Sequence, residues 1–80
     1  MAKLAQHDES VFLAIGEKIR ELRFEAGYES YETFAYDHEL DRKQYWRLEA
    51  GANITIKSLL KILAIHRLSL KEFFSDSRFK

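Results

Sequence analysis

The sequence predicts an all-α fold, in which five short helices surround a single hydrophobic core. Apolar residues recur at three- and four-residue steps along most of the 80-residue chain, which is the period of an amphipathic helix. A Ser, Thr or Asp precedes each of these stretches, as is typical of the residue that caps a helix N-terminus. Pro is absent, and no repeat or low-complexity segment interrupts the pattern.

Length and composition favour one small soluble domain. A chain of 80 residues with 46% hydrophobic residues forms a globular domain, but its core is thin, and dimerisation would add stability. Cys is absent, which excludes a disulfide scaffold and a thiolate nucleophile and fits a reducing cytosol. The polar N-terminus lacks the apolar core of a signal peptide, and no apolar run approaches the roughly 20 residues of a membrane span.

The charge is balanced overall but unevenly distributed. A formal net charge of zero counts against a protein that binds nucleic acid through a generally basic surface. Residues 28–40, however, hold four acidic side chains and no Lys or Arg, whereas residues 57–80 hold six basic and two acidic ones. Any binding to nucleic acid would therefore depend on a local patch, and non-specific binding should be weak.

The first helix is expected to begin at Ser10, after a flexible arm of residues 1–9 that has no apolar period. Gly27 is expected to end it, because a helix commonly closes with a left-handed residue. One apolar stripe follows the helix between these limits and consists of Phe12, Ile15, Ile19, Leu22 and Ala26.

Two short helices joined by a tight turn are predicted between Ser30 and Gly51. Ser30 is expected to cap the first, whose apolar side carries Phe34, Ala35 and Tyr36. Asp41 is expected to cap the second, in which Tyr45 and Leu48 stand three residues apart and share a face. The opposite face presents residue types that read base edges and bind phosphates, namely Arg42, Lys43, Gln44, Trp46 and Arg47.

Two further helices complete the domain. Thr55 is expected to cap a fourth helix, and Ser69 and Glu72 form a capping box at the start of a fifth. The apolar stripe of the fourth helix is expected to be Ile56, Leu59, Leu60 and Leu63, and that of the fifth Leu70, Phe73 and Phe74. We expect the domain to cover residues 10–75, with half-buried His66 in its fourth helix, and residues 76–80 to form a C-terminal tail.

Residues 30–51 resemble the helix-turn-helix of the Cro and lambda-repressor-like (XRE-type) family. The positions that match the spacing of that motif are Ser30, Phe34, Ala35, Leu40, Asp41, Tyr45, Leu48, Glu49 and Gly51. The resemblance extends from about Phe12 to Phe74. It implies a compact five-helix, lambda-repressor-like DNA-binding domain that acts on double-stranded DNA as a homodimer, in the cytoplasm at the nucleoid.

The resemblance also implies which side chains contact DNA. Arg42, Lys43, Gln44 and Arg47 lie where members of the family contact bases. Phosphate contacts fall to Ser30, Tyr31, Trp46, Asn53, Thr55 and Lys57. The residues themselves leave alternatives open: Tyr31 packs on the surface, the charged face is simply solvated, and Trp46 covers the core beside it, which we favour over a contact with DNA or with a partner.

The resemblance also implies one ion pair, and the sequence departs from the family pattern at two places. Arg23 and Glu49 are expected to form a structural ion pair between the first and third helices. Glu39 stands where the family usually has Gly, so either this turn differs or Glu39 is strained by a positive φ. The link through Tyr28 and Glu29 is one residue longer than usual, which should alter the link and not the helices.

The function expected is that of a sequence-specific transcriptional regulator of the repressor kind, which reads the major groove with residues 42–50. The alternative is a protein-interaction module, such as an antitoxin bound to a toxin or an adaptor, which zero net charge and exposed aromatic residues favour. We expect no enzyme activity, no cofactor and no metal, since Asp37, His38 and Glu39 do not converge. Candidate dimer surfaces are the fifth helix with Leu13 or Phe79.

Overall fold

The computed structural model describes the backbone of residues 2–79 and the side chains of residues 9–79. Five α-helices and one short 3₁₀ helix make up this part of the chain, and it contains no strand. The elements are α1 (Ala2–Glu25), α2 (Tyr31–Asp37), α3 (Arg42–Glu49), α4 (Ile56–His66), α5 (Leu70–Phe73) and η1 (Ser77–Phe79). The predicted all-α, five-helix fold is therefore confirmed.

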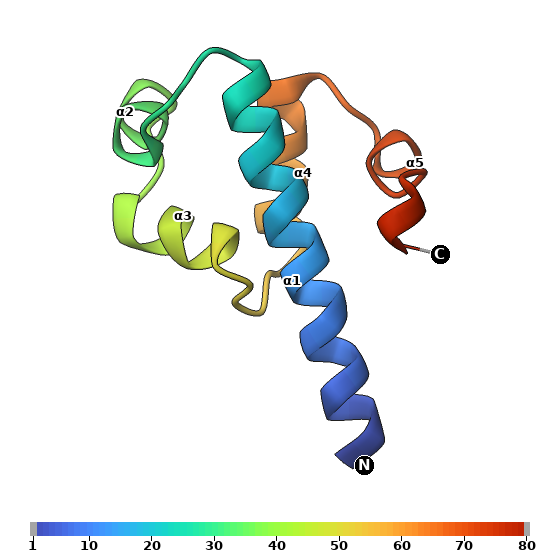
Figure 1. Ribbon diagram of the computed structural model, residues 1–80. Coiled ribbons are helices and arrows are strands. Elements are labelled where there is room, and N and C mark those ends of the chain that lie inside the picture. Colours follow the sequence, from blue (N-terminus) through green and yellow to red (C-terminus); the bar gives the residue numbers. More distant parts are fainter. Residues whose placement is uncertain (1, 80) are drawn as a thin grey trace.

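The long helix α1 forms the axis of the molecule, and the other helices are arranged around its C-terminal half (Figure 1). α2 and α3 lie on one side of it, and α5 with the C-terminal end of the chain lies on the opposite side. The N-terminal turns of α1 project beyond the globule, and the principal extents are 39 × 25 × 21 Å. Within the described part of the chain, no helix combines the length and apolar character needed to cross a membrane.

The core is built from apolar side chains of all five helices. Phe34 of α2 and Tyr45 of α3 meet at its centre, with ring centroids 5.1 Å apart. The buried apolar residues are Ile15, Ile19, Phe34, Ala35, Tyr45, Leu59, Ile62, Leu63 and Phe73. The apolar side predicted for α2 is therefore wrong for Tyr36, which is 84% exposed. Because α2 and α3 each contribute to this shared core, the helix-turn-helix is fixed to the rest of the domain.

The start of α1 differs from the prediction. The helix begins at Ala2, so Ser10 lies inside it and caps nothing, and the boundary predicted at Ser10 is wrong. Met1 of the predicted arm lies outside the described residues, and the flexibility of residues 2–9 stays a prediction. Ile15 and Ile19 of the predicted stripe are buried, whereas Ala26 lies beyond the helix and is exposed.

The caps of the later helices are those predicted from the sequence. The side-chain oxygen of Ser30 accepts from the amides of Glu32 and Thr33, and that of Asp41 accepts from the amide of Gln44. The start of α4 is capped in the same way by Thr55. At α5 both bonds of the capping box are present: the amide of Glu72 donates to Ser69 Oγ (3.0 Å) and the amide of Ser69 to Glu72 Oε1 (2.9 Å).

Four helices end in the same motif, in which a residue with positive φ follows the last turn. The amide of the next residue then donates to a carbonyl five residues earlier: Tyr28 to Arg23 (3.1 Å), Leu40 to Ala35 (2.8 Å), Ala52 to Arg47 (2.9 Å) and Leu68 to Leu63 (3.0 Å). Gly27 and Gly51 occupy two of the positive-φ positions, but Glu39 (56°) and Arg67 (58°) occupy the others. Of the two alternatives left open at Glu39, the structure shows the strained positive φ.

The buried stripe of α4 differs from the prediction. Leu59, Ile62 and Leu63 are buried, whereas Ile56 is 63% exposed and Leu60 47% exposed. The helix carries apolar residues on most of its circumference, so their spacing alone does not choose the inner face. The predicted stripe is therefore wrong for Ile56 and Leu60 and omits Ile62.

The C-terminal segment packs on the domain. Phe79 of η1 lies 5.6 Å from the ring of Phe73 and 4.8 Å from that of Phe74. Asp76 pairs with Lys18 of α1 at 3.1 Å, and nearby Arg78 pairs with Glu21 of the same helix. Phe79 is therefore half-buried against the domain, and its role as a dimer contact stays a prediction. Lys80 lies outside the described residues.

Candidate nucleic-acid interface

Helix α3 is held against α1 and α2 by its inner face. Tyr45 is 2% exposed, and burial together with the Glu49 carboxylate raises the pKa of its phenol. The backbones of α1 and α3 meet at Gly16, where a Cβ would lie 2.6 Å from the carbonyl oxygens of Leu48 and Glu49. Any side chain at Gly16 would push α3 away. The sequence offered one signal of this contact, a Gly inside an amphipathic helix.

Arg23 and Glu49 form the ion pair expected from the resemblance. Arg23 Nε donates to Glu49 Oε2 at 2.7 Å and Arg23 Nη2 to Glu49 Oε1 at 3.0 Å, which is a bidentate geometry. The remaining nitrogen, Nη1, donates to the carbonyls of Tyr28 (3.0 Å) and Glu29 (2.7 Å). The Arg23 side chain therefore ties the end of α3 to α1 and to the link before α2, and its hydrogen bond to Glu49 raises its pKa.

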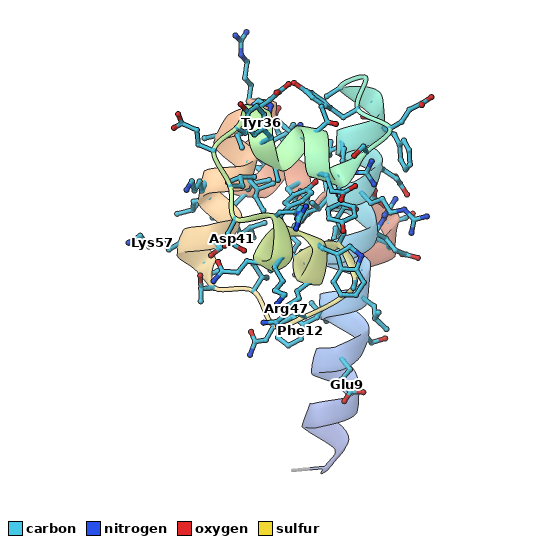
Figure 2. The ribbon with its side chains drawn as sticks, turned by 90° about the vertical axis from the view of Figure 1, so that its left-hand side faces the viewer. Glu9, Phe12, Tyr36, Asp41, Arg47 and Lys57 are labelled. Atoms are coloured by element: carbon cyan, nitrogen blue, oxygen red, sulfur yellow. The ribbon has the colours of Figure 1, made fainter. Side chains whose placement is uncertain are left out.

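The outer face of α3 is open to solvent. All four side chains predicted to contact bases are exposed and lie on this one helix: Arg42, Lys43, Gln44 and Arg47. In Figure 2 α2 and α3 face the viewer, and Arg47 extends from α3 near the lower edge of the globule. No other segment of the described chain covers this surface in that view. The structure thus brings these four residues together.

A groove of about 450 Å³ runs beside α3, and we call it the α2–α3 groove. Its walls are Tyr31, Glu32, Arg42, Lys43, Trp46 and Arg47. Three of these residues are cationic, but the Arg42 guanidinium lies 3.7 Å from the Glu32 carboxylate. Both side chains are well exposed, so this pair is weak and opens at little cost. The groove combines cations with aromatic walls.

Trp46 and Tyr31 differ in how they are held. Trp46 is 51% exposed and lies outside the group of side chains packed on the core, so the favoured expectation that it covers the core is wrong. Tyr31 is half-buried and packs against the core, while one side of it still lines the α2–α3 groove. Trp46 is therefore a large aromatic surface that the fold itself does not use.

The other residues predicted to contact phosphates surround α3. Asn53 and Lys57 are exposed, and Lys57 lies at the edge of the face in Figure 2 that is farthest from α1. Ser30 uses its oxygen to cap α2, which leaves its hydroxyl hydrogen free. Thr55 both accepts from the amide of Ser58 (3.1 Å) and donates to Ser58 Oγ (3.0 Å), so its hydroxyl is already engaged.

Two histidines lie against Phe34, directly behind the turn into α3. The His38 ring is 4.5 Å from that of Phe34, and the His66 ring stacks on it at 5.4 Å with a 7° interplanar angle. Burial lowers the pKa of His66, and nearby His38 lowers it further. The sequence predicted a half-buried His66, but it did not indicate that His38 would share its aromatic neighbour.

Comparison with known proteins adds one relative. The chain is 38% identical over 65 residues to control protein C.MunI of Mycoplasma sp, which covers 80% of this chain and 88% of that protein. The chain matches no family model and no solved structure. The matched region is long enough to include most of the helical domain described above. On this likeness, the chain belongs to the same family as control protein C.MunI.

Proposed function

We propose that this protein is a DNA-binding transcriptional regulator of the XRE helix-turn-helix type, which inserts α3 into the major groove of double-stranded DNA. One observation carries the proposal. Tyr45 and the Arg23–Glu49 pair fix the inner side of α3, while its outer side presents four exposed groups able to bind base edges. The likeness to a protein named as a control protein supports a regulatory role.

The side chains on α3 have distinct preferences for bases. Arg42 and Arg47 can each donate two hydrogen bonds to O6 and N7 of guanine, and Gln44 can pair with N6 and N7 of adenine. Lys43 donates from a single ammonium group. Arg42, Lys43 and Gln44 lie in the first turns of α3, the part of a recognition helix that enters the groove.

Contacts with the phosphates would position α3 without reading sequence. Tyr31 and Trp46 can donate from their hydroxyl and indole groups beside the α2–α3 groove. On the other side of α3, Asn53 and Lys57 are exposed near the start of α4, where the free amides of that helix also favour an anion. Ser30 and Thr55 cap helices, and their roles at phosphates remain part of the proposal.

The zero net charge shapes how the protein would use these contacts. With Glu32 next to Arg42, the interface attracts DNA in general only weakly. Binding then depends on base contacts more than on counterion release. Such a regulator, located at the nucleoid, would bind tightly to a few DNA sites and only weakly to the rest of the chromosome.

Regulation would be by occupancy of the operator as a homodimer. Two copies related by a two-fold axis place their α3 helices about 34 Å apart, which is one turn of DNA. Leu70 of α5 is 39% exposed and Leu13 of α1 is 55% exposed, so the predicted surfaces at these two positions remain open. A bound dimer that overlaps a promoter excludes the polymerase, and this makes repression the expected sign.

Selection from a random pool of duplexes at low salt tests the proposal. We expect one sequence to be enriched, and we expect Arg42→Ala and Arg47→Ala each to weaken its binding by roughly 10- to 100-fold. Lys71→Ala, which removes an exposed cation from α5 on the far side of the molecule, should bind like the wild type. If no sequence is enriched, or if both Arg variants bind unchanged, the proposal is wrong.

A protein-interaction module, antitoxin or adaptor, is the second candidate. Tyr36 on the outside of α2 favours it, because this aromatic side chain is 84% exposed and touches no part of the core. Purification of the native complex, followed by Tyr36→Ser and by charge reversal at Arg42, separates the two functions. A stoichiometric partner that is lost with Tyr36→Ser but retained with Arg42→Glu would support this role.

A further inference from the structure

A second hollow lies between α1 and α3, next to the α2–α3 groove. Its volume is about 370 Å³, and we call it the α1–α3 hollow. It is lined by Arg20, Arg23, Phe24, Tyr31, Trp46, Glu49 and Ala50. Tyr31 and Trp46 line both spaces, so the α1–α3 hollow continues the α2–α3 groove toward α1.

Arg20 is the cation in this hollow that is available to a ligand. Arg23 is 4% exposed, and its three nitrogens already bond to Glu49 and to two backbone carbonyls. Arg20, one turn earlier on α1, is exposed, and within the described residues it forms no ion pair or hydrogen bond. Its guanidinium therefore has all of its donors free.

Aromatic side chains form the walls of the hollow. Phe24 is 49% exposed, and its ring lies 4.5 Å from the Arg23 guanidinium carbon, so the ring covers the buried ion pair. Trp46 opposes it from α3 with about half of its surface in water. These surfaces suit the apolar C–H face of a deoxyribose, while the indole N–H and Arg20 suit an anion beside it.

The acidic groups near the hollow are largely neutralised. Glu49 is paired with Arg23, and Glu21 is paired with Arg78 at 2.8 Å. Glu17 lines a neighbouring space with Arg20 and Phe24, and it is exposed to solvent. Two of these three carboxylates therefore carry their own counter-charge, so an anionic ligand at Arg20 meets repulsion mainly from solvent-exposed Glu17.

We propose that the α1–α3 hollow binds the sugar–phosphate backbone of the DNA flanking each half-site, with Arg20 on a phosphate and Phe24 and Trp46 against its deoxyribose. This inference rests on the proposed function, since α3 must first be docked in the major groove. It assigns part of the DNA-binding surface to α1, outside the helix-turn-helix. The contact would add affinity and no sequence preference.

Arg20→Gln tests the contact, with Lys71→Gln as its matched control on α5. Binding to the selected duplex is measured across a salt series. We expect Arg20→Gln to bind about fivefold more weakly at moderate salt, the value of one exposed ion pair, and to reduce the salt slope by about one. Trimming the flanks of the duplex by about 10 base pairs should weaken the wild type but not Arg20→Gln.

The outcomes separate this inference from the proposed function. If the wild type binds a selected duplex and Arg20→Gln matches it in affinity, salt slope and response to trimming, the inference is wrong and the proposed function stands. A change in base preference in Arg20→Gln would also overturn it, because a backbone contact reads no sequence. If the wild type selects no duplex, both proposals fail together.

Discussion

Glu39 and Arg67 each hold a left-handed backbone conformation in which a side chain is disfavoured. Their φ values are 56° and 58°, and each residue lies just beyond the end of a helix that a Schellman-type pair of hydrogen bonds closes. A non-Gly residue in this region costs roughly 1–2 kcal/mol. Glu39 lies in the turn between α2 and α3, so this cost opposes the observed orientation of α3. Packing against the core, and not the turn residue, therefore maintains that orientation.

Glu39→Gly should relieve this strain. Glycine adopts the conformation freely but loses more entropy on folding, so the net gain is about 0.5–1 kcal/mol, or a few degrees in Tm. Thermal unfolding followed by circular dichroism measures it. Glu39→Gln, which removes the charge but keeps the strain, should unfold like the wild type, and a Glu39→Gly variant no more stable than Glu39→Gln would contradict the account.

His66 makes stability depend on pH in a defined window. Burial lowers its folded pKa below the unfolded value of about 6.5, so below that pH the unfolded state binds more protons than the folded state. Stability is therefore full above about pH 6.5 and falls as the pH drops toward the folded pKa. Urea unfolding at about pH 7.5 and about pH 5.5 should show this loss for the wild type.

His66→Leu should remove much of that dependence, because the aliphatic Leu side chain can pack against Phe34, as the His66 ring does, but binds no proton. The free energy of unfolding of the variant should then change less between the same two pH values. An unchanged slope in His66→Leu would contradict the assignment of the acid sensitivity to His66.

Local signals explain which single-residue features could be predicted. The caps at Ser30, Asp41 and Thr55 depend only on residues within one helical turn, and the sequence identified all three. Trp46 shows the limit: whether an aromatic residue covers the core depends on the space that neighbouring helices leave. That space is filled by residues distant in sequence, so its position could not be inferred from α3 alone.

At the scale of the elements, α3 is set by long-range contacts with α1. The Arg23–Glu49 pair joins residues 26 apart, and the contact at Gly16 brings two backbones together without a side chain between them. The resemblance to the family implied the ion pair, whereas the close approach at Gly16 was missed. A pattern of apolar residues shows which face is inward, but it does not show how near two helices come.

The ion pair should matter most when one partner is lost. Glu49→Leu leaves the Arg23 guanidinium buried without its counter-charge, and we expect a loss of about 3–5 kcal/mol in the free energy of unfolding. Arg23→Met combined with Glu49→Leu should recover much of this loss, since it removes the isolated charge. Urea unfolding of the wild type, of both single variants and of the double variant gives a double-mutant cycle for the pair. If the two single losses add up in the double variant, Arg23 and Glu49 are not energetically coupled.

The errors at the scale of elements have physical causes. The N-terminal turns of α1 lack an apolar stripe, so periodicity gave no sign of a helix there, although residues 2–25 form one. In α4 the apolar residues cover too much of the helix for periodicity to choose between Leu60 and Ile62. In both cases the sequence pattern was too weak or too uniform to decide, and the packing of the whole domain decided instead.

At the scale of the whole molecule, the exposed apolar residues bear on self-association. A domain of this size gains stability from an interface. Leu70→Glu on α5 places a charge on a proposed dimer surface. If the protein forms the proposed homodimer through α5, light scattering after gel filtration should show that this variant is monomeric. Lys71→Gln on the same helix should leave the dimer intact. A Leu70→Glu variant that stays dimeric would move the interface away from α5.

The distribution of charge also belongs to the whole molecule. A net charge of zero gave no indication of DNA binding, yet the fold places Arg42, Lys43 and Arg47 on one open surface. Composition averages over positions that folding separates. The residues on the outer face of α3 could therefore be predicted from the sequence, because one helix carries them all. The α1–α3 hollow could not be predicted, because its walls come from α1, α2 and α3.

The central claim is that the outer face of α3 reads bases, and a change of specificity tests it most directly. Binding is measured for the wild type and for Arg47→Gln against every single-base-pair variant of the selected operator. We predict that Arg47→Gln shifts the preference at one position in each half-site from guanine toward adenine and leaves the other positions unchanged. An identical preference profile for the two proteins, at any affinity, would contradict the claim.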